Sequence, residues 1–120
     1  MSKIESRTLR QELGQFTGTE TWYRHPLNRN LLYTEGVQFF AERAGCYWFL
    51  DIAATELFRL QRTEPFLVIT LAVDDGEADI VVDDGDGSAV FRRHIHFTDA
   101  PSGDWRFYLT DNVVLLPSEY

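Results

Sequence analysis

The chain has little of what marks several specialised protein classes. Its 120 residues include one cysteine, four prolines and eight glycines. Because Cys46 cannot form an internal disulfide, the sequence favours a reducing cytoplasm over a secreted, disulfide-linked scaffold. The longest uncharged apolar run, residues 65–73, is far shorter than the roughly 20 residues of a membrane span, and no targeting peptide is expected. The sequence therefore predicts one domain, residues 1–120, with no membrane contact.

Basic residues are scarce in the second half of the chain. Residues 1–63 carry 8 basic and 7 acidic side chains, a net charge of +1, whereas residues 64–120 carry 3 basic and 12 acidic ones, a net charge of −9. Direct binding of nucleic acid is not expected, because phosphate binding needs clustered cations. Most of these acids fall in three predicted turn regions, at 74–79, 83–86 and 99–104.

Motifs for catalysis and cofactor binding are missing from the sequence. It has no glycine-rich phosphate loop, nucleophile elbow, paired-cysteine zinc motif or kinase signature, so no cofactor is predicted. The acidic segments 74–76 and 83–88 suit hairpin turns, in which Asp-Gly adopts positive φ angles, better than calcium loops. Cys46 precedes an aromatic run, so we expect a packed thiol rather than a nucleophile.

The hydrophobic period predicts helices in the first half of the chain and strands in the second. Three helices are expected at 3–15, 35–44 and 47–60, the second with Thr34 as its N-cap and Gly45 after its end. Five strands are expected at 66–73, 78–83, 89–98, 105–110 and 113–116. Short connections favour sequential antiparallel pairing. The predicted fold is α+β, with three N-terminal helices packed on one face of a five-stranded antiparallel meander sheet.

Alternation along the predicted strands separates an inner face from an outer face. The inner, apolar set is Leu67, Ile69, Leu71, Val73, Ile80, Val82, Phe91, Ile95, Phe97, Trp105, Phe107, Leu109, Val114 and Leu116. The outer polar set is Thr70, Asp79, Arg92, His94, His96, Arg106, Tyr108 and Thr110. Because valines also point outward, this half-apolar open face is a candidate surface for a protein partner or a homodimer.

Two histidines lie two residues apart on a predicted strand, so both imidazoles point to one side, as metal ligands would. In a meander, the next hairpin sets His96 opposite Arg106 and His94 opposite Tyr108, and a cation beside His96 disfavours a metal. The preceding hairpin sets Asp79 opposite His94. This row suits a polar cross-strand ladder, a ligand patch or general acid–base chemistry. We expect the ladder, and no metal site.

Two charged residues stand in apolar surroundings. Asp51 lies within an apolar helix, and Arg93 lies on an otherwise apolar strand face. Because a buried charge must be paired, we predict a structural buried ion pair between Asp51 and Arg93. The alternative is a carboxylic acid at the floor of a pocket, placed to act as a general acid.

The segment 21–26 concentrates aromatic and charged side chains in a predicted loop. It contains Trp22, Tyr23, Arg24 and His25. Trp, Tyr and Arg anchor many interfaces, so these residues are a candidate binding surface. We expect instead that Trp22 and Tyr23 fill one edge of the core while Arg24 and His25 cap neighbouring carbonyls, because aromatic burial alone explains these residues.

Several stretches carry a resemblance to a known family. They are residues 16–20 with Tyr23 and His25, residues 32–37, residues 44–45 with Tyr47, Trp48 and Asp51, and residues 109–113 and 116–120. Together they resemble a bacterial family of short proteins of unknown function, often encoded on plasmids and mobile elements. The resemblance implies one domain over nearly the whole chain and no assigned reaction. The final Tyr120 either docks over the core or serves as a peptide-like ligand, and we expect docking.

Three functions fit these observations. The first is a non-enzymatic cytoplasmic interaction protein that binds a protein partner or itself through the outer sheet face and residues 22–25. The second is an acidic mimic of nucleic acid that inhibits a DNA-binding protein; it requires evenly spaced carboxylates on one exposed face. The third is a small enzyme that uses Asp51 or His94 as acid or base, which requires a pocket around one of them. We expect the first.

Overall fold

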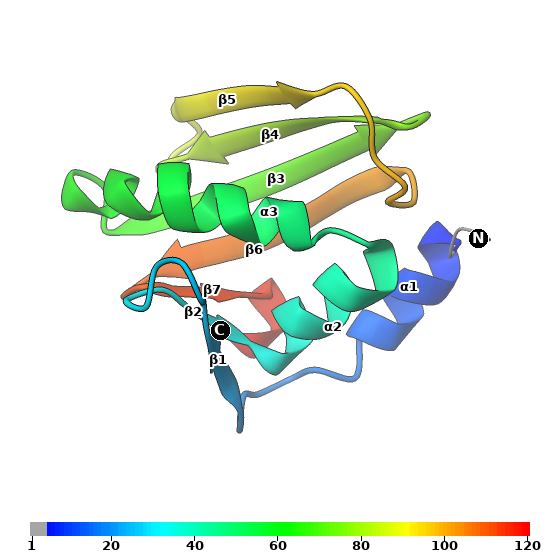
Figure 1. Cartoon of the computed structure of the whole chain (residues 1–120), viewed down its shortest axis with the longest axis horizontal. Coiled ribbons are helices and arrows are strands. Elements are labelled where there is room, and N and C mark those ends of the chain that lie inside the picture. The colour runs from blue at the N-terminus through cyan, green and yellow to red at the C-terminus, as the bar shows by residue number, and fades with distance from the viewer. Residues whose placement is uncertain (1–4) are drawn as a thin grey trace.

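The computed structural model describes residues 5–120. In this part of the chain, seven strands form one mixed sheet, and helices α2 and α3 pack on one of its faces (Figure 1). The helices are α1 (Ser6–Leu13), α2 (Glu35–Ala44) and α3 (Tyr47–Ile52), which continues as a π-helical turn (Ala53–Leu57) and a 3-10 helix (Phe58–Arg62). The strands are β1 (Trp22–Arg24), β2 (Leu32–Thr34), β3 (Phe66–Asp74), β4 (Glu77–Asp83), β5 (Ala89–Ile95), β6 (Gly103–Thr110) and β7 (Val113–Leu115), and a 3-10 turn (Pro117–Glu119) follows. The α+β class is confirmed.

Helix α2 begins and ends where its sequence signals predict. The Thr34 side chain accepts a hydrogen bond from the backbone N–H of Val37, and Glu35 places a negative charge in the first turn. Gly45 follows the last turn with φ of 67°, a left-handed conformation that ends the helix. The predicted first helix is shorter than expected, at Ser6–Leu13, and the first two positions predicted for it, 3 and 4, lie outside the described residues.

The sheet has the order β1-β2-β7-β6-β3-β4-β5. The predicted meander is wrong, because β6 pairs with β3 rather than with β5, and β2 pairs with β7 in parallel. The connection between β5 and β6, residues 96–102, contains enough chain to cross the three strand spacings, about 14 Å, that separate these strands. The β3–β4 turn is tight by comparison, with Asp75 and Gly76 at positive φ.

Strands β1 and β2 replace a predicted loop. Each contains three residues, too few for alternation to be visible in the sequence. They pair with each other antiparallel, and β2 joins the sheet through β7. Residues 22–24 therefore lie at one edge of the sheet.

The predicted inner face forms the core with few exceptions. The inner side chains of β6, which are Trp105, Phe107 and Leu109, are buried. Phe40 of α2 contacts the rings of Trp105 and Phe107, and Phe49 of α3 contacts Phe107. Phe91 and Ile95 on the edge strand β5 are only partly buried. The prediction that Phe97 lies on the inner face is wrong. Its side chain is 75% exposed, because β5 ends at residue 95 and the chain then leaves the sheet.

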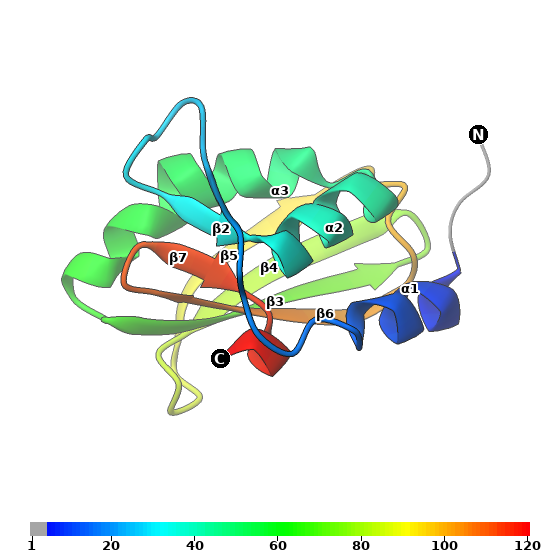
Figure 2. The same cartoon turned by 90° about the horizontal axis from the view of Figure 1, so that it is seen from below.

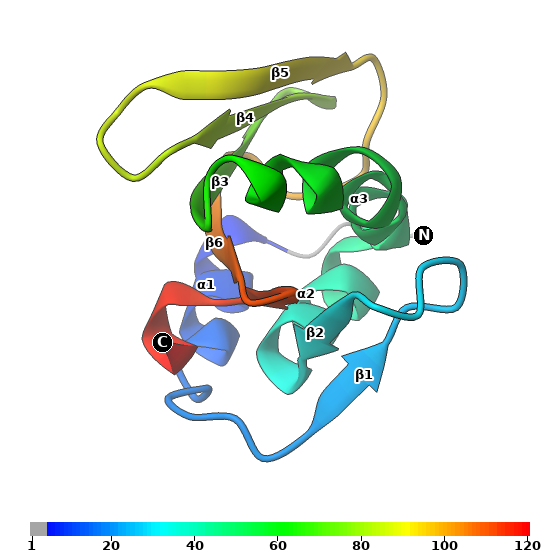
Figure 3. The ribbon, with the colours of Figure 1, turned by 90° about the vertical axis from the view of Figure 1, so that its left-hand side faces the viewer.

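The two faces of the sheet differ in their cover. Helices α2 and α3 lie on one side, and the C-terminal turn lies on the other (Figures 2 and 3). Helix α1 lies beside the start of β6, where Arg10 stacks over the ring of Trp105 at 4.4 Å. Within residues 5–120, no helix has the length and apolar character needed to cross a membrane.

Candidate functional site

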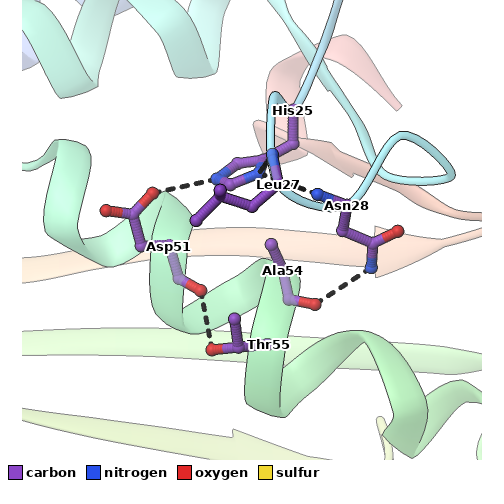
Figure 4. A network of polar contacts seen from close by, with 6 residues as sticks. All are labelled: His25, Leu27, Asn28, Asp51, Ala54 and Thr55. Carbon is purple, nitrogen blue, oxygen red and sulfur yellow. Dashed lines mark hydrogen bonds and ion pairs between the residues drawn. The ribbon is translucent and has the colours of Figure 1, made fainter.

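His25 joins the loop between β1 and β2 to helix α3 (Figure 4). The ring is 2% exposed, and its Nε2 lies 2.9 Å from Asp51 Oδ1. Its Nδ1 accepts the backbone N–H groups of Leu27 and Asn28 at 3.0 and 3.3 Å. Because Nδ1 is an acceptor, Nε2 carries the proton and donates it to Asp51. Both ring nitrogens are thus occupied, so this imidazole holds the loop in place and has no free nitrogen for catalysis.

The predicted Asp51–Arg93 ion pair is wrong. Asp51 is 60% exposed and contacts His25, whereas Arg93 forms an ion pair with Glu56. At about 100° per residue, a side chain five positions later points to a different side of the helix. Asp51 therefore faces the β1–β2 loop and Glu56 faces β5. Asp51 also lies at the surface rather than at the floor of a pocket.

A second polar network surrounds Glu119, which is 9% exposed. Its carboxylate accepts the hydroxyl proton of Thr34 at 2.6 Å and the backbone N–H of Gly36 at 3.3 Å. It also accepts from Thr19 Oγ1 at 3.2 Å and from the Leu116 N–H at 3.0 Å. The network thus joins the start of α2 to the C-terminal turn, and it brings together three of the stretches on which the family resemblance depends.

Gly36 is fitted closely to this network. A Cβ at this position would lie 2.7 Å from Leu116 Cδ1 and 2.8 Å from Glu119 Oε1. Tyr120 follows Glu119 and packs its ring against Phe66 and Tyr108, with centroids 5.4 and 5.5 Å apart. Tyr120 thus contacts the outer face of the sheet, but it is 74% exposed, so the expectation that it docks over the core is wrong.

A third network of polar side chains lies on the outer face of β4 and β5, at the end near the β3–β4 turn. Asp79 lies opposite His94, as predicted. His94 Nδ1 is 2.8 Å from Asp79 Oδ1, and its Nε2 is 2.9 Å from Glu77 Oε1. These two hydrogen bonds, that of Asp79 first, raise the pKa of His94. The ring of His96 meets that of His94 edge to face, with centroids 4.8 Å apart.

The predicted neighbours of the two histidines on β6 are wrong. Arg106 lies opposite Thr70 and Tyr108 lies opposite Val68, because β6 pairs with β3. Strands β3 and β4 therefore separate Arg106 from His96. Sequence reasoning missed Glu77, although the predicted Asp79–His94 register, continued by two residues, places Glu77 beside His96.

The predicted site residues are divided among several places. Trp22 and Tyr23 are 50% and 38% exposed, so they do not fill the core edge. Tyr23 stacks on Tyr33 with centroids 5.6 Å apart, and Arg24 donates to the carbonyl of Arg29 at 2.5 Å. Arg92 is exposed on β5. The set therefore does not form one binding surface.

Cys46 and the acidic turns have the structural roles expected of them. Cys46 is fully buried, and burial raises the pKa of its thiol to about 12. In the β4–β5 turn, Asp84 Oδ1 accepts the backbone N–H groups of Asp86 and Ser88 at 2.9 and 3.2 Å. These contacts are those of a hairpin turn.

A surface groove lies on the outer face beside the Glu119 network. Its volume is about 320 Å³, and it is lined by Thr19, Trp22, Thr34, Thr110, Val113, Leu115, Glu119 and Tyr120. A larger cavity of about 380 Å³ lies between α1, β6 and the C-terminal turn, with Arg10, Leu13, Trp105 and Pro117 among its lining residues. In the described part of the chain, neither cavity is lined by Asp51 or His94.

These features define a small α+β domain in which the polar network of Glu119 joins the start of α2 to the C-terminal turn. Residues 7–120 match a family of unknown function, DUF6876, and the chain belongs to this family. No curated protein and no solved structure matches the chain. The resemblance to a family without an assigned function is thereby confirmed over most of the chain.

Proposed function

We propose that this protein is a non-enzymatic interaction protein that binds a protein partner through the aromatic half of its outer sheet face. The observation that carries this proposal is the position of two exposed aromatic rings, Trp22 and Tyr120, at one surface groove. Interaction sites tend to gather exposed apolar side chains into one patch, and Trp and Tyr are common anchors of protein interfaces.

The register of the strands explains why these side chains lie together. Trp22 pairs with Thr34, and both point to the outer face, as do Leu115 and Tyr108 on the strands that follow. Phe66 and Tyr108 support the ring of Tyr120 from below. These contacts hold the Tyr120 side of the groove in place, so binding there would bury apolar surface with little ordering of that ring.

Charge indicates the kind of partner. The chain carries a net charge of −8, so a partner with an apolar patch and basic surroundings would be steered toward it. The buried thiol of Cys46 suits the reducing cytoplasm as the compartment.

Two other functions, an acidic mimic of nucleic acid and a small enzyme, have less support. The acids at 83–86 cluster at a hairpin tip rather than at even spacing along one face, which does not support a mimic of nucleic acid. Asp51 and His94 both lie at the surface with their hydrogen bonds satisfied by neighbours, which does not support an enzyme based on them.

Affinity capture from the native cell tests the proposal. The bait is the full chain with an N-terminal tag, because Tyr120 contributes to the groove. We expect a specific partner on the wild-type bait and its loss on a Trp22→Ala/Tyr120→Ala bait. Light scattering of the pure protein shows whether the partner is a second copy.

Tyr47→Ala is the matched control. Tyr47 is 43% exposed on helix α3, away from the groove, so this variant should retain the partner. The proposal is overturned if the double variant captures the same proteins as the wild type, or if the wild type captures none specifically.

A further inference from the structure

Four side chains that carry metal-binding chemistry converge on the outer face, at the end of the sheet near the β3–β4 turn. His94 and His96 lie on and just after β5, and Glu77 and Asp79 lie on β4. The ligand atoms of Glu77, His94 and His96 all lie within 4.8 Å of one another. All four side chains are exposed, so an ion can reach them from solvent.

We propose that Glu77, His94 and His96 bind a divalent transition-metal ion of the zinc type. Two imidazole nitrogens and one carboxylate oxygen are a common ligand set for zinc, with a fourth position left for water or an added group. A tetrahedral zinc ion with bonds of about 2.0–2.1 Å separates its ligand atoms by ~3.3 Å. Because the side chains are exposed, small rotations about their own bonds close the remaining distance.

Asp79 is the positioning residue of this site. Its carboxylate lies 2.8 Å from His94 Nδ1, so it accepts the Nδ1 proton and leaves Nε2 as the nitrogen that can bind a metal. Nε2 points at Glu77 Oε1, 2.9 Å away. A carboxylate that orients a ligand histidine from its far nitrogen recurs in protein zinc sites. The ion would replace this direct contact between Nε2 and Glu77.

The sequence-based objection to a metal does not apply to the folded chain. That objection was that the cation of Arg106 would lie beside His96 and repel a metal ion. In the structure, Arg106 lies opposite Thr70 on β3. The residue that the register brings beside His96 is Glu77, because Ala78 pairs with Ile95 one step earlier. Asp74 and Asp75 in the adjoining turn add negative charge, which attracts cations to this end of the sheet.

His96 separates this proposal from a purely structural interpretation. The hydrogen bonds of His94 to Asp79 and Glu77 would hold a protonated imidazole without any help from His96. A metal site needs His96 as a ligand. Removal of His96 should therefore abolish metal binding while the His94 contacts persist.

Zinc titration of the full-length protein tests the proposal. The protein is first stripped with a chelator and then titrated with ZnCl₂ by calorimetry at a pH of about 7.5, above the ordinary pKa of histidine. We expect one zinc per chain, and a loss of affinity of at least about tenfold in His94→Ala and in His96→Ala. Visible absorption of the protein loaded with CoCl₂ should show tetrahedral coordination in the wild type and not in these two histidine variants.

Two further variants act as positioning test and control. Asp79→Asn should weaken zinc binding about tenfold, as removal of an outer carboxylate does in other sites. Asp86→Asn removes the same charge at the distant β4–β5 turn and should leave affinity unchanged. The proposal is overturned if the wild type does not bind zinc, or if the His94→Ala/His96→Ala double variant, shown to be folded by circular dichroism, binds it equally well.

Discussion

His25 with Asp51 and His94 with Asp79 are the same pair of side chains at nearly the same distance, 2.9 and 2.8 Å. They differ in their surroundings. His25 is 2% exposed and its second nitrogen is fixed by two backbone N–H groups, whereas His94 lies in solvent and its second nitrogen meets a movable carboxylate. The first pair holds a loop in place, and the second is free to exchange its proton for another cation.

The comparison teaches that the partner of the second nitrogen decides what a histidine–aspartate pair can do. A backbone N–H cannot move without opening the chain, so it fixes the orientation of the imidazole and gives it a structural role. A surface glutamate can rotate away or share an ion. The same contrast separates the buried carboxylate of Glu119 from the exposed one of Glu77.

The largest expected effect concerns the two glutamates. Glu119→Ala should destabilise the fold by about 3 kcal/mol, because it leaves buried groups such as the Gly36 N–H without an acceptor. Glu77→Ala should leave stability unchanged. Urea unfolding followed by circular dichroism measures both, and an equal effect of the two changes would refute the contrast.

Gly36→Ala tests the same network from the other side. Alanine is the better helix former, by about 1 kcal/mol, yet the variant should be less stable by about 1–2 kcal/mol because the new methyl group meets Leu116 and Glu119. If the variant is instead more stable in the same urea experiment, then Leu116 and Glu119 move aside for the methyl group without cost, and the predicted strain is absent.

His25→Ala should destabilise the protein by about 2 kcal/mol, because the N–H groups of Leu27 and Asn28 lose their acceptor in a buried place. His94→Ala serves as the matched control and should unfold at the wild-type urea concentration. If both variants shift the midpoint alike, the two pairs do not differ in the way proposed.

Asp51→Asn should lower the stability of the protein less than His25→Ala does, and it separates the contribution of charge from that of geometry in the His25–Asp51 pair. The amide oxygen can still accept the Nε2 proton of His25, so only the assistance of the charge is lost, about 0.5–1 kcal/mol. Thermal unfolding of Asp51→Asn beside His25→Ala measures this difference. A loss as large as that of His25→Ala would mean that the charge, and not the geometry, holds the loop.

The smallest effect is expected at Cys46, which reports on opening of the core. Because burial raises the pKa of the thiol to about 12, only about one molecule in 10⁴ carries a thiolate at a pH near 8. A thiol reagent such as DTNB should therefore label native protein and His94→Ala equally slowly, and label His25→Ala faster. Rapid labelling of the wild type would contradict the packed position of this residue.

Sequence reasoning succeeded where the signal was local. The Thr34 cap, the Gly45 stop, the inner face of β3 and β6 and the Asp79–His94 pairing all follow from neighbours in the chain or across a tight turn. It failed where pairing was distant. Nothing in a period-two pattern states that β6 lies beside β3, and the partner of Asp51 depends on which side of the helix faces a loop with no pattern of its own.

The place of β7 in the sheet bears on the order in which the chain folds. β1 and β2 are made early, but they join the sheet only through β7, which lies between β2 and β6. During synthesis they can pair with each other, but they stay apart from the rest of the sheet until residues 113–115 have left the ribosome, because contacts so distant in the chain form late. The two N-terminal strands are thus the first to be made and the last to be attached.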